Sequence, residues 1–133
     1  FMLFFEKQEN WIFNKRLIMK PLSWYREIYI RDKYKCVYCG KDMKNNLDSW
    51  LSLQIDHIVP ASKGGKDNIE NRATSCNVCN LLKRDYLPDN WELITKKQLV
   101  DKMRKFIKSK RDKWEIEYKK ALKEYEKATF QKE

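Results

Sequence analysis

Glycine, proline and histidine are scarce in this chain of 133 residues, which has three, three and one of them respectively. So few glycines and prolines argue against a low-complexity or disordered protein, and 42% hydrophobic residues are enough to fill a core. No apolar run approaches the roughly 18 residues that a membrane span needs, and the apolar start at residues 1–5 is too short for a secretion signal. We therefore expect one soluble domain in the cytoplasm and no membrane partner.

Acidic residues are outnumbered. The chain has 29 Lys and Arg against 19 Asp and Glu, so its formal net charge is +10. A strongly basic domain is suited to a polyanion such as nucleic acid, and an anionic membrane surface is the weaker alternative.

The four cysteines form two identical pairs, Cys36-x2-Cys39 and Cys76-x2-Cys79. Four thiolates at this spacing can hold one Zn²⁺ in a closed tetrahedral site, which is structural because no position is left open for water. The 36 residues between the pairs (40–75) must then form a folded insert. Two disulfides, a thioredoxin-like redox pair or unpaired cysteines are the alternatives, and no second feature supports redox work.

Three regions differ in pattern: a segment of unknown role at 1–30, a core at 31–88 and a basic helical region at 89–133. A short amphipathic helix is expected at 24–30. In the core, the alternation at 51–55 predicts a strand, and a return strand at 72–74 and a helix at 77–86 follow it. This order is a ββα unit, and the fold class is α+β.

His57 is the only histidine and directly follows Asp56. Taken alone, such a histidine is more often a packed or surface residue than a catalyst. Imidazole, with an ordinary pKa of about 6.5, is nevertheless suited to deprotonating water near neutral pH. Asp56 and Asn80 offer oxygen ligands for a hard cation such as Mg²⁺ or Mn²⁺. Because successive strand residues point to opposite faces, Asp56 and His57 can serve one phosphate only if regular pairing breaks near them.

Several motifs in order resemble an HNH endonuclease of the ββα-metal class, in the subgroup with a four-cysteine zinc site. They are the two cysteine pairs, Asp56-His57-Ile58-Val59-Pro60, Gly64-Gly65, Asn68-Ile69-Glu70-Asn71, and the Asn80-x2-Lys83 that follows Cys79. The resemblance covers roughly residues 26 to 88. It implies that His57 is the general base, that Asn71 orients the imidazole, and that Asp56 and Asn80 hold the catalytic metal. The plainer alternatives are a turn hydrogen bond for Asn71 and packing beside the second cysteine pair for Asn80.

The basic residues suggest where nucleic acid binds. Lys83 and Arg84 are expected to contact phosphates. Residues 95–113 have nine bases against two acids, a charge of +7, so Lys102, Lys105 and Lys108 are expected to follow the DNA backbone. An ordinary solvated helix face is the alternative for these lysines.

The C-terminal region predicts one long helix, or two helices separated at Lys110, with Asp89 or Asn90 as the cap. The apolar stripe of this region, from Leu99 to Ala128, offers a contact for a homodimer.

The sequence thus predicts a metal-dependent endonuclease that cleaves double-stranded DNA. A zinc-dependent nucleic-acid-binding module without catalysis is the alternative.

Overall fold

The computed structural model describes residues 22–131. Most of the predicted segment 1–30 therefore lies outside the described residues. In chain order the helices and strands are α2 (Leu22–Arg31), α3 (Leu47–Leu51), β1 (Leu53–His57), β2 (Arg72–Cys76), α4 (Asn77–Lys83) and α5 (Lys96–Phe130). Short 3-10 helices lie at Ala61–Lys63, Ile69–Asn71 and Trp91–Leu93. A small sheet among helices confirms the predicted α+β class.

The sheet has two antiparallel strands, β1 and β2, with Leu53 opposite Cys76 and His57 opposite Arg72. β1 begins two residues later than the predicted start at residue 51, because residues 47–51 form α3. This helix is capped by the side chain of Asn46, which accepts a hydrogen bond from the backbone N–H of residue 49. The predicted order of strand, strand and helix is confirmed by β1, β2 and α4.

α4 follows β2 without a loop. Cys76 ends the strand and caps the helix, since its Sγ accepts from the backbone N–H of Cys79 at 3.4 Å. The helix ends at Lys83, three residues before the predicted end at residue 86. Arg84 has a φ of 49°, in the left-handed region, and this conformation stops the helix.

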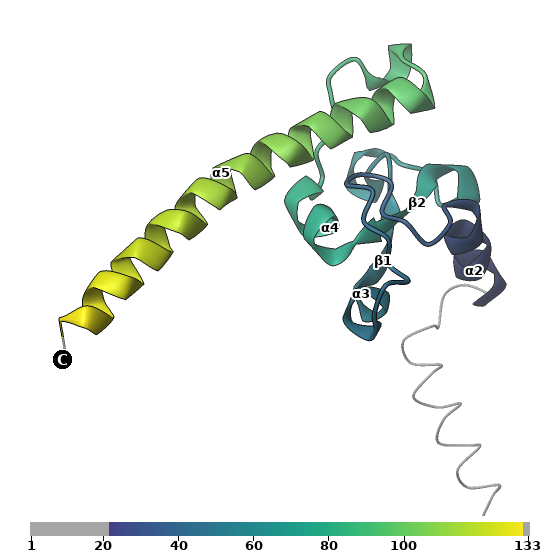
Figure 1. The fold of residues 1–133 in the computed structure, drawn as a ribbon. Helices are drawn as coiled ribbons and strands as arrows, with labels where there is room; N and C mark the ends of the chain where they lie inside the picture. The colour runs from purple at the N-terminus through teal and green to yellow at the C-terminus, as the bar shows by residue number, and fades with distance from the viewer. Residues whose placement is uncertain (1–21, 132–133) are drawn as a thin grey trace, which may run out of the picture.

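α2 confirms the amphipathic helix expected at 24–30 and packs against β2. Ile28 is fully buried, and the Arg31 guanidinium donates to the carbonyl oxygens of Ile69 (3.0 Å) and Arg72 (2.6 Å). The Asp32 carboxylate accepts from the backbone N–H of Thr74 at 2.8 Å. These contacts hold α2 beside β2, as Figure 1 shows.

α5 begins later than predicted. Thr95 is its cap, and it forms a capping box with Gln98 in which each side chain accepts from the other residue's backbone N–H (2.9 and 3.2 Å). The predicted caps, Asp89 and Asn90, precede the 3-10 helix at Trp91–Leu93 instead.

The first half of α5 is anchored to the core by Leu99, Met103 and Ile107, all of which are buried. The helix runs unbroken for 35 residues, and Lys110 does not interrupt it. The ammonium of Lys110 lies 4.8 Å from the centroid of the Phe106 ring, a cation–π contact along the helix.

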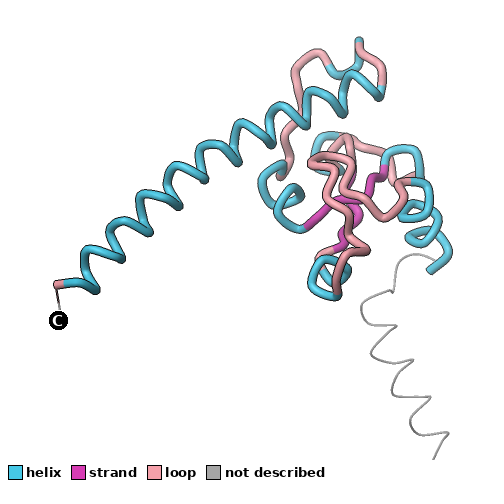
Figure 2. The backbone as a smooth tube through the Cα atoms, viewed as in Figure 1, coloured by secondary structure: helices cyan, strands magenta, loops and turns pink. Residues whose placement is uncertain are grey.

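Beyond residue 113, α5 projects away from the core (Figures 1 and 2). Trp114, Tyr118 and Tyr125 on this half are 64%, 59% and 66% exposed. They belong to the stripe for which a homodimer contact was predicted, and that contact stays a prediction, as does the division at residues 30 and 88. Within residues 22–131 no helix combines the length and the apolar character that a bilayer crossing requires.

Candidate functional site

The four cysteine sulfurs converge on one point. All four lie within 4.8 Å of one another, the Sγ atoms of Cys39 and Cys76 are 3.9 Å apart, and all four thiols are free. Sulfurs bound to one zinc at about 2.3 Å form a tetrahedron with edges of about 3.8 Å. The spacing and the all-thiolate chemistry therefore suit zinc, and the structure does not support the disulfide alternative.

The first cysteine pair is a tight turn attached to the sheet. The backbone N–H of Cys36 donates to the carbonyl of Lys41 at 2.9 Å, and Gly40 supplies a φ of 76° that other residues rarely adopt. The N–H of Val37 donates to the carbonyl of Thr74 at 3.0 Å, which holds this turn beside the end of β2. The second pair lies at the junction of β2 and α4, so the fold itself brings the two pairs together.

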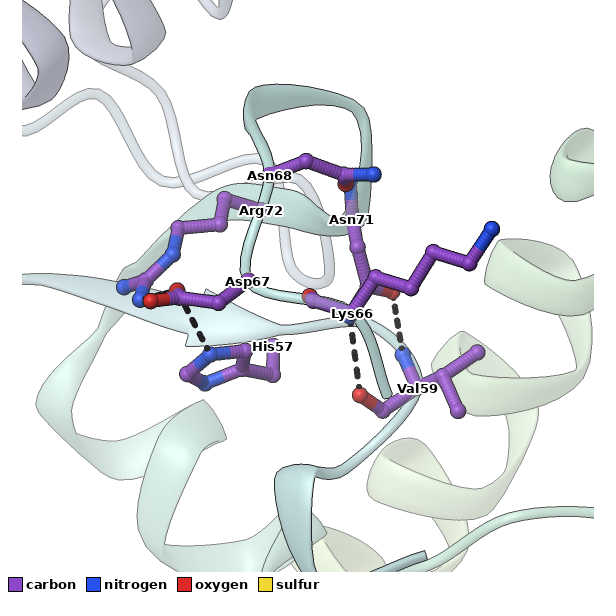
Figure 3. A network of polar contacts seen from close by, with 7 residues as sticks. All are labelled: His57, Val59, Lys66, Asp67, Asn68, Asn71 and Arg72. Carbon is purple, nitrogen blue, oxygen red and sulfur yellow. Dashed lines mark hydrogen bonds and ion pairs between the residues drawn. The ribbon is translucent and has the colours of Figure 1, made fainter. Parts of the chain in front are cut away.

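His57 is the last residue of β1, and its side chain is 27% exposed. Its Nε2 lies 3.4 Å from an Oδ1 of Asp67, in the loop between the strands (Figure 3). Arg72, opposite His57 in the sheet, donates to the same carboxylate oxygen. Asp67 was not among the predicted site residues, because nothing in the spacing of the loop distinguishes it.

Asn71 closes the loop between the strands. Its Oδ1 accepts from the N–H of Val59 at 2.9 Å, and its Nδ2 donates to the carbonyls of Val59 (3.0 Å) and Lys66 (2.8 Å) (Figure 3). The prediction that Asn71 orients the imidazole needs correction: its amide bonds backbone groups, and the Asp67 carboxylate lies beside the ring. Asn71 shapes the loop that carries Asp67.

At Gly65 the same loop closely approaches the backbone just after β1. A Cβ atom at this position would lie 1.8 Å from the carbonyl oxygen of Val59, so only glycine fits. The Gly-Gly turn seen in the sequence is thus required by packing as well as by backbone conformation.

Asp56 is 7% exposed and faces the opposite side of β1 from His57. The Lys83 ammonium lies 2.9 Å from its Oδ2, and the Tyr38 hydroxyl donates to the same oxygen. Burial, and then the charge of Asp56, raise the pKa of Tyr38 well above its ordinary value, so the phenol keeps its proton and remains a donor. Both contacts use Oδ2, and neither uses Oδ1.

Asn80 faces the same side of β1 from α4. Its Nδ2 donates to Oε1 of Gln54, which is two residues before Asp56 and therefore shares its face of the strand. The structure thus brings the elements of the two predicted metal ligands together. In both Asp56 and Asn80 one side-chain polar atom already has a protein partner. The side-chain oxygen of Asn80, Oδ1, is the atom that suits a cation.

The expected break in strand pairing does not occur at Asp56 and His57. The ladder continues through His57 and Arg72, and the N–H of Ile58 still donates to the carbonyl of Asn71 at 2.8 Å. The two side chains leave opposite faces of a strand that is paired along only one edge in the described sheet. A phosphate can approach both of them only from the other edge.

Lys83 does not lie where a phosphate contact requires it. The residue is 1% exposed, and its ammonium donates to the carbonyl of His57 at 2.9 Å in addition to pairing with Asp56. Burial therefore removes Lys83 from the predicted DNA contacts and makes it a support of both site residues. Arg84, Lys102, Lys105 and Lys108 are exposed.

We predict that Lys83→Met lowers the free energy of unfolding by about 3 kcal/mol or more, because the buried Asp56 carboxylate loses its counter-charge. The double variant Asp56→Leu, Lys83→Met should recover part of this loss, since it removes both charges. Urea unfolding of the zinc-loaded protein measures both values. Lys105→Met, on the surface, is the control, with an expected change within about 0.5 kcal/mol. A change that small for Lys83→Met would show that the pair adds nothing to stability.

A family model described as HNH endonuclease matches residues 36–86, within the predicted core. Comparison with curated proteins and with solved structures found no significant match. The matched segment spans both cysteine pairs, both strands, α4 and the loop held by Asn71. This chain therefore carries an HNH domain over residues 36–86, with the four-cysteine cluster inside it.

Proposed function

We propose that this chain is a metal-dependent endonuclease that hydrolyses phosphodiester bonds of double-stranded DNA. The observation that carries the proposal is the position of His57. It is a partly exposed imidazole at the end of a strand, beside a carboxylate, within a segment that matches the HNH endonuclease family.

His57 is the proposed general base. The Asp67 carboxylate orients the ring through Nε2, and the imidazole is proposed to accept the proton of the attacking water. Arg72 keeps the carboxylate in place, and Asn71 keeps the loop closed around it. In this scheme Asn71 acts on the imidazole through the loop and not by direct contact.

Asp56 and Asn80 are the proposed ligands of the catalytic cation, Mg²⁺ or Mn²⁺. Oδ1 of Asp56 and the side-chain oxygen of Asn80 are the atoms that would hold it, and they suit a hard cation. Such an ion, when bound, lowers the cost of charge on the phosphate and on the leaving oxygen. Lys83 and Tyr38 both contact Oδ2 of Asp56 and so fix the direction of its carboxylate.

The four cysteines are proposed to hold structural zinc. The site would link the turn at residues 36–39 to the start of α4, which also carries Asn80. Free thiols of this kind persist in a reducing compartment, so the proposal includes a cytoplasmic location.

The first half of α5 is the proposed contact with the DNA backbone. Lys102, Lys105 and Lys108 are exposed there, and only Lys108 has an ion pair with a described residue, Asp112 at 2.9 Å. Because both partners of that pair are more than half exposed, it is weak and can give way to a phosphate. Arg84, directly after α4, is also exposed.

The zinc prediction is one tightly bound Zn²⁺ per chain in the purified protein. Cys76→Ser should lower both the metal content and the thermal midpoint, because zinc binding is coupled to folding. Inductively coupled plasma mass spectrometry and circular dichroism measure the two effects. A folded, active sample without zinc would contradict this prediction.

The catalytic prediction is that His57→Ala lowers the cleavage rate by at least about 100-fold and leaves zinc content and DNA affinity near wild type, because only the base is removed. The assay measures nicking of supercoiled plasmid with Mg²⁺ or Mn²⁺, with and without EDTA. Ser62→Ala, in the loop between β1 and β2, is the control. Asp56→Ala and Asn80→Ala should instead raise the Mg²⁺ or Mn²⁺ concentration needed for half-maximal rate.

Two results of the plasmid assay would overturn this scheme. Cleavage by His57→Ala at the wild-type rate would exclude His57 as the base. A shift in plasmid mobility with no metal-dependent nicking by the wild-type protein would favour the non-catalytic binding module.

The prediction for the first half of α5 concerns how DNA affinity depends on salt concentration. Reversing Lys102, Lys105 and Lys108 to Glu should weaken binding to all DNA sequences alike. It should also flatten the slope of log affinity against log salt by roughly 0.9 for each phosphate that a lysine no longer neutralises, about 2.7 for all three. Reversing Lys119, Lys120 and Lys123 on the outer half of α5 changes the charge equally and is the control. Equal slopes for the two triple variants would mean that the inner lysines make no specific backbone contacts.

A further inference from the structure

Two arginines of α5 contact the cysteine pairs, one arginine to each pair. Arg104 and Arg111 are seven residues apart, which is close to two full turns, so they lie on the same side of the helix, beside its buried residues. Nε of Arg104 donates to the carbonyl of Val37, inside the first pair, at 2.7 Å. Nη2 of Arg111 donates to Sγ of Cys79 at 3.3 Å and lies 3.8 Å from Sγ of Cys76.

The charge of the cysteine cluster explains why a guanidinium suits this position. Four thiolates around one Zn²⁺ leave a net charge of −2, and three of these cysteines are buried, so water screens the charge poorly. An arginine stays protonated, is more weakly hydrated than an ammonium, and can direct several N–H groups at neighbouring acceptors. Arg111 therefore offsets half of the charge at little cost in dehydration.

A second observation also links Arg111 to the cysteine cluster. Nε of Arg111 is buried and has no hydrogen-bond partner among residues 22–131. An unpaired buried donor is unfavourable and needs a compensating interaction nearby. The acceptors beside this guanidinium are the sulfurs of the second cysteine pair. Its interaction with these sulfurs is therefore the one that compensates for the unpaired Nε.

We propose that Arg111 is a positioning residue of the zinc site: its guanidinium hydrogen-bonds the Cys79 thiolate, lowers the negative charge of the cluster and slows loss of the metal. This inference rests on the proposed zinc and is independent of the nuclease chemistry. It also means that the bound metal helps to hold α5, and with it the exposed lysines of that helix, against the core.

The test is the rate at which the zinc-loaded full chain releases metal to an excess of a chromogenic chelator. Arg111→Gln should release zinc about tenfold faster or more, the range found when a partner of a metal ligand is removed. Lys113→Gln removes the same charge from an exposed position two residues away and should stay near the wild-type rate. Arg111→Lys keeps the charge without the fork of donors and should also release zinc faster than wild type.

Alkylation of Cys79 by iodoacetamide, followed by peptide mass spectrometry, adds a readout at the contacted sulfur. Arg111→Gln should expose Cys79 to modification earlier than wild type, and circular dichroism verifies that the variant is folded. Equal release rates for Arg111→Gln and Lys113→Gln would overturn the proposal. If Arg111→Gln does not fold, a wild-type release rate for Arg111→Lys would overturn it instead. Absence of zinc from the folded wild-type protein would overturn the zinc proposal and this one together.

Discussion

Convergence of the four cysteine sulfurs is the constraint on which the other parts of this structure depend. Among residues 22–131 the sheet has two strands, and a two-stranded sheet is marginally stable by itself in water. Bringing the turn at residues 36–39 to the start of α4 closes a long segment that contains α3, β1 and the loop held by Asn71. The N–H of Val37 and the carbonyl of Thr74 make the same connection through the backbone. A metal at this point would therefore stabilise every element that carries a candidate site residue.

Polar side chains divide β1 into two faces with different chemistry. On one face, Asp56 is buried between the Lys83 ammonium and the Tyr38 hydroxyl. On the other face, His57 is partly exposed and meets Asp67. The buried ion pair fixes a carboxylate that would otherwise be too costly to bury, and the exposed imidazole keeps access to solvent. Consecutive residues thus acquire opposite environments because the strand stays regular through His57.

α5 combines an anchor and an exposed arm in one helix. Met103 and Ile107 are buried against the core, and two arginines beside them contact the cysteine pairs, whereas Lys102, Lys105 and Lys108 are exposed. A helix that repeats every 3.6 residues separates these two sets without any break in the chain. The basic charge near the core is thereby divided into arginines that support the fold and lysines that are available to a polyanion.

The sequence by itself determined the elements whose signals are local or chemically unambiguous. The spacing of the cysteines indicated a metal cluster, alternation and helical periodicity indicated strand, strand and helix, and the order of motifs around His57, Asn71 and Asn80 indicated an HNH domain. The ends of the helices were predicted less accurately. The cap at Thr95 and the left-handed Arg84 compete with equally good signals a few residues away.

Only the tertiary structure decided which polar groups meet. Lys83 is buried against Asp56, Asp67 lies beside His57, Asn71 bonds the backbone of the loop, and Arg111 reaches Cys79. Lys83 and Arg111 each reach a residue on another element of the fold. The contacts of Asp67 and Asn71 depend on how the loop between the strands closes. A charged residue in a sequence looks the same whether it will face water, a phosphate or a buried counter-ion. Its environment is set by the packing of segments distant in the chain, and no local periodicity records that packing.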